Sequence, residues 1–156
     1  MKAKEYLRKI QIVDSIISAK MKEVDKLSTK VESVLTIAAG VQAIRYDKDK
    51  VQSSTSNKIE DNMIRVSEAT EELNRSIREL ENSINQYKRI RRRITTQIEL
   101  MGAGEGNILY SEVLYRRYVL YMSFEQIAVD MGYSYQHILR IHGLALKKFQ
   151  EMYLEK

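Results

Sequence analysis

Cysteine, proline and tryptophan are absent from this 156-residue chain. The absence of cysteine and of proline restricts the classes of protein to which the chain can belong. Without cysteine there is no disulfide framework and no cysteine metal site, which fits a cytoplasmic protein. Without proline, a chain with 30% charged residues and apolar residues three and four apart is expected to be all-α. The longest apolar runs, such as residues 34–39, are too short to cross a bilayer, and residues 1–9 are too charged for a signal peptide. We therefore expect a helical protein with no membrane contact.

The excess of positive charge is small. The chain has 26 basic and 21 acidic residues, which gives a net charge of +5. Basic charge is typical of proteins that bind nucleic acid, but many other proteins are equally basic. Charge alone therefore does not identify a function.

Two long amphipathic helices are predicted in the first two thirds of the chain. The first spans about residues 2–39 and is expected to end at Gly40, and the second spans about residues 58–101 after a loop at about 40–57. Apolar residues recur in each at steps of three and four, the heptad pattern of a left-handed coiled coil. The predicted inward positions of the first helix are Ile10, Val13, Ile17, Met21, Val24, Leu27, Val31, Val34 and Ala38. Those of the second are Ile59, Met63, Val66, Thr70, Leu73, Ile77, Leu80, Ile84, Tyr87, Arg91, Ile94, Ile98 and Met101.

Helices this long need a partner helix, and two arrangements satisfy that need. The two helices can fold back as an antiparallel hairpin, or the second can pair with its copy in a parallel dimer. We favour the hairpin, with hairpins associating through these N-terminal helices into a homodimer. Thr70 and Arg91 interrupt the apolar pattern: either they fix the register, or the Arg91 side chain extends to solvent and Ile90 takes its place.

Three glycines lie within five residues, at 102, 104 and 106. We interpret residues 102–106 as a hinge between a coiled-coil domain, residues 1–101, and an end domain, residues 107–156. A phosphate-binding loop is the alternative, but no strand precedes the glycines and no Lys-Ser/Thr pair follows them.

Residues 124–143 have the spacing of a helix-turn-helix, in which two short helices cross around a tight turn. Ala128 is the small residue where the helices touch, and Gly132 is the turn residue that requires a positive φ. Ser123 with Gln126 forms a capping box for the first helix, and Ser134 caps the second. The predicted apolar contacts are Ile127, Met131, Tyr133, Ile138 and Ile141. The three helices of the end domain are expected at about 108–120, 124–131 and 134–153. Their further inward residues are Leu109, Val113, Leu114, Tyr118, Ala145, Phe149 and Met152.

The sequence MSFEQIAVDMGYSYQHILRIHGLALKKF, residues 122–149, resembles region four of bacterial sigma factors. The elements that carry the resemblance are the E-x-I-A of the first helix, the Gly-x-Ser turn and the A-L-K-K-F ending. The whole chain looks like small sigma-like proteins of phages and mobile elements in Gram-positive bacteria, through a V-Q-S-S segment at 51–54, R-Y at 117–118 and R-I-H-G-x-A-L at 140–146. This resemblance implies a helix-turn-helix protein that controls transcription. It also implies that the positions of Tyr135, Gln136 and Arg140 face base edges.

The chemistry of these residues agrees with DNA reading. Glutamine pairs bidentately with adenine and arginine with guanine, and Leu139 can touch a thymine methyl or cover a protein partner. Sigma factors usually carry charged residues at the positions of Tyr135, Gln136 and Leu139, so a promoter-like preference does not follow. The candidate backbone contacts are Ser123, Ser134, His137, Arg116, Arg117, Lys147 and Lys148.

A basic run before the glycines consists of Lys88, Arg89, Arg91, Arg92 and Arg93, and the further candidate contacts within it are Lys88, Arg89, Arg92 and Arg93. This run can extend a DNA footprint, form a solvated face or pair with acids of the first helix. His137 and His142 are five residues apart and do not share a helix face, so no metal site is expected, and we expect His142 to pack or to meet a partner. Gly143 within a helix suggests a close helix approach. No cofactor is expected.

These features favour a dimeric, sequence-specific transcription regulator that binds double-stranded DNA. One alternative is a DNA-packaging adaptor of the small-terminase type, which also joins a helix-turn-helix to helical oligomerisation segments. A second is a sigma-like factor or anti-sigma partner that docks on RNA polymerase. No enzyme is expected, since the sequence has no nucleophile–base signature, no metal cluster and no nucleotide loop.

Overall fold

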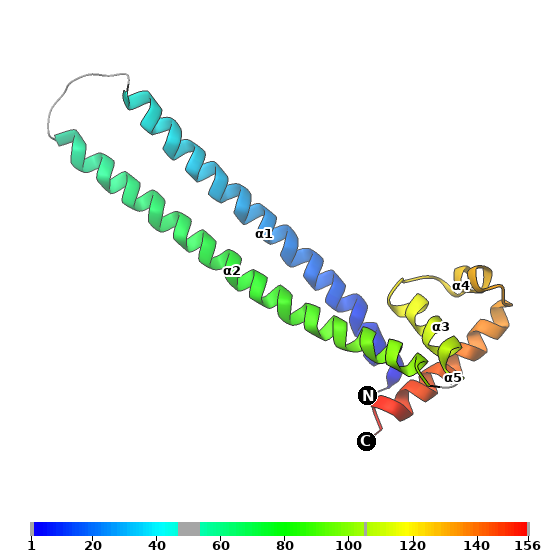
Figure 1. The fold of residues 1–156 in the computed structure, drawn as a ribbon. Helices are drawn as coiled ribbons and strands as arrows, with labels where there is room; N and C mark the ends of the chain where they lie inside the picture. Colours follow the sequence, from blue (N-terminus) through cyan, green and yellow to red (C-terminus); the bar gives the residue numbers. More distant parts are fainter. Residues whose placement is uncertain (1, 47–53, 105, 156) are drawn as a thin grey trace. The chain divides into compact units, whose positions relative to one another are not determined.

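The computed structural model describes residues 2–46, 54–104 and 106–155, with side chains described for 2–40, 60–104 and 106–155. The described residues form helices and no strand, which confirms the all-α prediction (Figure 1). The helices are α1 (Ala3–Tyr46), α2 (Ser54–Gly102), α3 (Ile108–Tyr118), α4 (Phe124–Met131) and α5 (Tyr135–Tyr153). Within the described residues no helix has the length and apolar character needed to cross a membrane.

The two long helices extend further than predicted at the ends that face the connection. Gly40 does not end α1, which continues to Tyr46, and α2 begins at Ser54 rather than near Asn57. A glycine inside a helix costs about 1 kcal/mol relative to alanine, too little to end a helix by itself. The predicted loop at about 40–57 is therefore wrong at both ends. Its centre, with most of the V-Q-S-S segment, lies outside the described residues.

Contacts divide the chain into two compact units whose limits differ from the predicted domains. The first unit combines Met1–Ile17 with Gln86–Lys156, and the second is Ser18–Asn85. The first turns of α1 and the last turns of α2 thus belong with α3, α4 and α5. Gly102 and Gly104 consequently lie inside the first unit, between segments that share one core.

That shared core explains why the first unit is compact. Leu7, Ile10, Ile98, Leu114 and Phe149, from α1, α2, α3 and α5, are fully buried in one hydrophobic cluster. The Ser111 hydroxyl also donates to the Ile98 carbonyl at 2.7 Å, which ties α3 to the last turns of α2. Burial of one such side chain contributes about 1.5–3 kcal/mol, so this cluster is a main source of stability for the unit.

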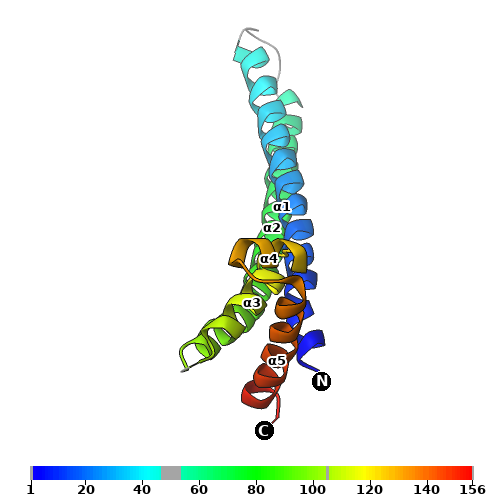
Figure 2. The same ribbon diagram turned by 90° about the vertical axis from the view of Figure 1, so that its right-hand side faces the viewer.

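The second unit consists of antiparallel segments of α1 and α2 that lie side by side in both views (Figures 1 and 2). The favoured hairpin is therefore confirmed. The predicted inward residues are half-buried at the following positions: Val24, Leu27, Val31, Val34, Ala38, Val66, Thr70, Leu73, Ile77 and Leu80. Met21 and Met63 are wrong as inward positions, since their side chains are 49% and 53% exposed. The Ile59 side chain lies outside the described residues.

Arg91 occupies the inward position of α2 that the heptad gives it. Its Nε donates to Asp14 Oδ1 of α1 at 2.7 Å. Ile90 does not replace it, because the Ile90 side chain is exposed. The second Asp14 oxygen accepts a hydrogen bond from the Tyr121 hydroxyl. One carboxylate therefore connects α1, α2 and the segment between α3 and α4.

Candidate nucleic-acid interface

The turn between α4 and α5 has the predicted helix-turn-helix geometry. The Ser123 hydroxyl accepts from the Gln126 N–H while Gln126 Oε1 accepts from the Ser123 N–H, which completes the capping box. Gly132 has φ 70°, a left-handed conformation that glycine adopts without steric cost. The Ser134 hydroxyl accepts from the His137 N–H at the start of α5. All three local predictions are confirmed.

Helix α5 is held against α3 and α4 by one face. Ile138 and Ile141 are buried with Val113, Ile127 and Ala128 in a second hydrophobic cluster. Two predicted contacts differ from this arrangement: Tyr133 is exposed, and Met152 is 37% exposed. Tyr133 instead lies against the His137 ring, with centroids 4.9 Å apart. It is a surface residue of the turn.

The opposite face of α5 carries the residues predicted to read bases. Tyr135, Gln136, Leu139 and Arg140 are all exposed and lie within the first two turns. Arg140 Nη2 is 3.0 Å from His137 Nδ1, so the guanidinium is held along the helix by its neighbour. The structure thus brings the four side chains onto one accessible surface, which we call the reading face.

The two arginines of α3 are engaged within the protein. Arg116 forms ion pairs with Glu112 of its own helix and Asp130 of α4. Arg117 Nη1 donates to the Met122 carbonyl at 2.8 Å, and its guanidinium lies 4.7 Å from the centroid of the Phe124 ring. These contacts restrict the conformations of both side chains. Arg116, neutralised by two carboxylates, has little charge left to offer a phosphate.

Glu125 places negative charge beside Ser123 at the start of α4. A backbone N–H, then the Ser123 side chain, and weakly the Arg117 charge lower the pKa of the exposed Glu125 carboxyl. A carboxylate there repels a phosphate, which makes Ser123 a weaker candidate for a backbone contact than Ser134. The two lysines further along α5 differ in exposure: Lys147 is exposed and Lys148 is half-buried.

The side chains of the basic run of α2 differ in their contacts. Arg91 pairs with Asp14, whereas Lys88, Arg89, Arg92 and Arg93 are exposed and form no ion pair with any described residue. The predicted pairing with acids of α1 therefore holds for one arginine only. The other four side chains form a solvated basic surface on the part of α2 that belongs to the first unit.

His142 is a packing residue, one of the two roles expected for it. Its Nε2 lies 3.1 Å from the Tyr118 hydroxyl, its ring stacks on Tyr118, and Phe124 meets it edge-on with centroids 4.9 Å apart. Burial, together with the nearby charges of Arg117 and Lys4, lowers the pKa of His142 to about 4. The imidazole is therefore neutral at neutral pH and can accept from Tyr118.

Gly143 does not mark a close helix approach. A Cβ placed there would meet nothing within 4 Å, and the residue is exposed. Among the described residues, no group of three or more His, Cys, Asp or Glu is arranged to hold a metal ion.

Comparison of the chain with known proteins adds no assignment. No family model, no curated protein and no solved structure matches it. The likeness to region four of sigma factors therefore stays a prediction that depends on the residues quoted for it.

Three residues near this surface were not predicted from the sequence. Lys4 and Arg8 of α1 lie close to α3 and α5, and Tyr121 has φ 57°, a conformation rare for a residue with a side chain. The i, i+4 spacing of Lys4 and Arg8 puts both on one helix face, which was a detectable signal. Their position next to α5 depends on tertiary packing, which that spacing does not reveal.

Proposed function

We propose that the protein is a sequence-specific, DNA-binding transcription regulator that reads the major groove with the first turns of α5. The observation that carries the proposal is the reading face. Its four side chains are exposed, while the opposite face of the same helix is fixed in a buried cluster. In helix-turn-helix proteins the second helix presents its N-terminal residues to base edges in this manner.

The polar members of the reading face supply the chemistry for reading. Gln136 can pair bidentately with adenine, and Arg140 with the O6 and N7 atoms of guanine. Ser134, His137 and Lys147 flank these residues and are suited to contact the DNA backbone. The exposed basic surface of α2, at Lys88, Arg89, Arg92 and Arg93, supplies further positive charge for a longer footprint.

We further propose that two chains associate through the second unit, since a dimer matches the symmetry of a palindromic operator. Large apolar side chains outside the hairpin contact support this: Met21, Leu35, Ile37 and Ile64 are between 49% and 68% exposed. Burial of such side chains against a second copy is favourable.

Substitution of the reading residues tests the base-reading role. Gln136→Ala and Arg140→Ala are each expected to weaken binding to the specific DNA fragment by about 1–3 kcal/mol, because each removes a bidentate base contact. Binding to unrelated DNA should hardly change. The measurement is fluorescence anisotropy with labelled fragments from the gene's own neighbourhood and with an unrelated duplex. Gln86→Ala, a change at an exposed residue of α2, is the matched control and should have no effect. Equal losses on both kinds of DNA would contradict the assignment.

A factor that docks on RNA polymerase is the second candidate, and one surface feature favours it. Glu125, Ala128, Val129, Tyr133 and Tyr135 line an open hollow of about 420 Å³, and Val129 there is 85% exposed. An exposed apolar surface of this kind suits a protein partner. Retention of full DNA affinity in Arg140→Ala, with loss of polymerase binding in Val129→Glu, would favour this candidate over the first.

A further inference from the structure

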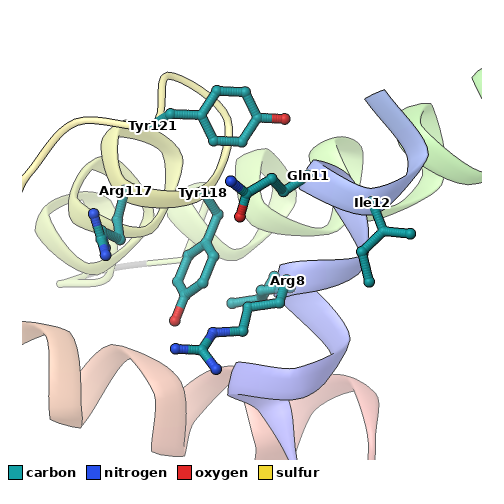
Figure 3. A pocket seen from close by; sticks show the side chains of 7 residues that line it. Arg8, Gln11, Ile12, Arg117, Tyr118 and Tyr121 are labelled. Carbon is teal, nitrogen blue, oxygen red and sulfur yellow. The ribbon is translucent and has the colours of Figure 1, made fainter. Parts of the chain in front are cut away.

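Two adjoining pockets lie between the first turns of α1 and the helix-turn-helix. One, of about 390 Å³, is lined by Leu7, Arg8, Gln11, Ile12, Arg117, Tyr118 and Tyr121 (Figure 3). The other, of about 250 Å³, is lined by Lys4, Arg8, Arg117, Tyr118, Phe124, Leu139 and His142. Arg8, Arg117 and Tyr118 line both pockets, and we call the two neighbouring pockets together the Arg8 cleft.

The Arg8 cleft is lined by three cations and, among the described residues, by no acid. Lys4 and Arg8 come from α1, and Arg117 comes from α3. None of the three forms an ion pair with any described residue, unlike Arg91 and Arg116 in the same unit. Unpaired cations close together repel one another, so an anion that lies between them is bound favourably.

This positive charge affects the pKa values of two residues that line the cleft, His142 and Tyr118. Burial lowers the pKa of His142, and Arg117 and Lys4 lower it further. For Tyr118, burial raises the pKa of the hydroxyl, while Arg8 and Arg117 act in the opposite direction. All three cations therefore act on groups at the cleft, in addition to lining it.

The arginine side chains are arranged so that they can bind an oxyanion. Arg117 is fixed by the Met122 carbonyl and the Phe124 ring, and a guanidinium has five N–H donors, of which this contact uses one. Arg8 and Arg117 approach the cleft from different helices, with Tyr118 between them (Figure 3). Pre-ordered arginine donors are well suited to phosphate oxygens.

The position of Leu139 connects the cleft with the reading face. Leu139 lines the smaller pocket and is also a member of the reading face, next to Arg140 and one turn from Gln136. When the first turns of such a helix enter the major groove, the phosphates of the groove edge pass beside the helix. We propose that the Arg8 cleft binds a backbone phosphate of the DNA, so that the start of α1 forms part of the DNA-binding surface. This inference rests on the proposed function.

The salt dependence of binding measures phosphate contacts directly. Each phosphate neutralised on duplex DNA contributes about 0.9 to the slope of log K against log salt concentration. The variant Lys4→Gln/Arg8→Gln removes two of the three cations that hold this one phosphate, so it is expected to lower the magnitude of the slope by about 1 and to weaken binding equally on specific and unrelated duplexes. The measurement is fluorescence anisotropy of both duplexes over a series of salt concentrations, with the full chain.

One control variant and one stability measurement keep the result interpretable. Lys9→Gln removes one cation from the exposed face of α1 without touching the cleft and should leave the slope unchanged. Thermal unfolding followed by circular dichroism should show that the double variant is as helical and as stable as the wild type, since Lys4 and Arg8 are exposed.

The outcomes separate the inference from the proposed function. An unchanged slope in Lys4→Gln/Arg8→Gln, with wild-type DNA binding intact, overturns the phosphate contact and leaves the regulator proposal standing. A wild-type chain that binds no duplex overturns both.

Competition by inorganic pyrophosphate at constant ionic strength distinguishes the source of the phosphate. If pyrophosphate binding is lost in the double variant while the DNA slope is unchanged, the cleft serves a soluble phosphate and the inference is wrong.

Discussion

His142 shows how a single buried side chain makes stability depend on pH. Its ring lies between Tyr118 and Phe124, and burial lowers its pKa from 6.5 to about 4. In the unfolded chain the same imidazole titrates near 6.5. Between these two values the unfolded state binds a proton that the folded state does not.

We expect the free energy of unfolding to fall as the pH drops from about 6.5 to about 4, and the His142 contribution to be constant above that range. The shift corresponds to about 3 kcal/mol, at about 1.4 kcal/mol per pKa unit. Urea unfolding followed by circular dichroism across this range measures the effect. In His142→Gln, which cannot titrate, the fall should be smaller by that amount, whereas His137→Gln should retain it. A fall of equal size in the wild type and His142→Gln would show that other groups cause it.

Helix by helix, the sequence predicted those features that depend on local pattern. The bounds of α4, the caps at Ser123 and Ser134 and the turn at Gly132 all follow from side chains that bond their own backbone or relieve a local strain. The hairpin followed from the heptad. Errors occurred where a residue's role depends on distant neighbours or on helix length, as at Gly40 and Gly143.

The candidate site was predictable to the same extent. The exposed positions of α5 follow from its amphipathic period, so the exposure of Gln136 and Arg140 was predicted correctly. Arg116 and Arg117 were predicted as candidate phosphate contacts. The Glu112 partner of Arg116 is visible in the sequence as an i, i+4 pair within α3. The Asp130 partner of Arg116 and the carbonyl and ring partners of Arg117 depend on tertiary packing, which no spacing in the sequence indicates.

At the scale of the helix, Gly143 is a position where the protein can be made more stable. It lies in the middle of α5, is exposed, and has open space where a Cβ would be. We expect Gly143→Ala to raise the free energy of unfolding by about 1 kcal/mol, because alanine has the higher helix propensity. Urea denaturation measures the change.

Gly132→Ala is the matched control for this prediction. It also adds one methyl group in open space, but at φ 70°, where an L-residue is strained by about 1–2 kcal/mol. This variant should therefore be less stable than the wild type. If both alanine variants change stability in the same direction, backbone conformation does not explain the difference between these two glycines.

At the scale of the whole molecule, the oligomeric state decides between the candidate functions. A mass of two chains by light scattering is expected if the exposed apolar residues of the second unit form the proposed contact. Ile37→Glu, at a side chain 68% exposed, should then give a single-chain mass, because a charge at an apolar interface is costly. Ile108→Glu, 72% exposed on α3 of the first unit, is the control and should leave the mass unchanged. A ring of about eight or more chains would favour a DNA-packaging adaptor.

The core of the first unit also determines when the chain can fold during synthesis. The Ala3 N–H donates to Gln150 Oε1, across 147 residues, and Leu7 is buried in the same cluster as Phe149. The first turns of α1 leave the ribosome before the residues of α5 that cover them are made. This core therefore closes only after α5 has been made, and until then its apolar surface is open to chaperones and to aggregation. Contacts of such long sequence separation also slow folding. Because the core stays open without α5, ribosome-bound nascent chains that lack α5 should remain sensitive to proteolysis within α1.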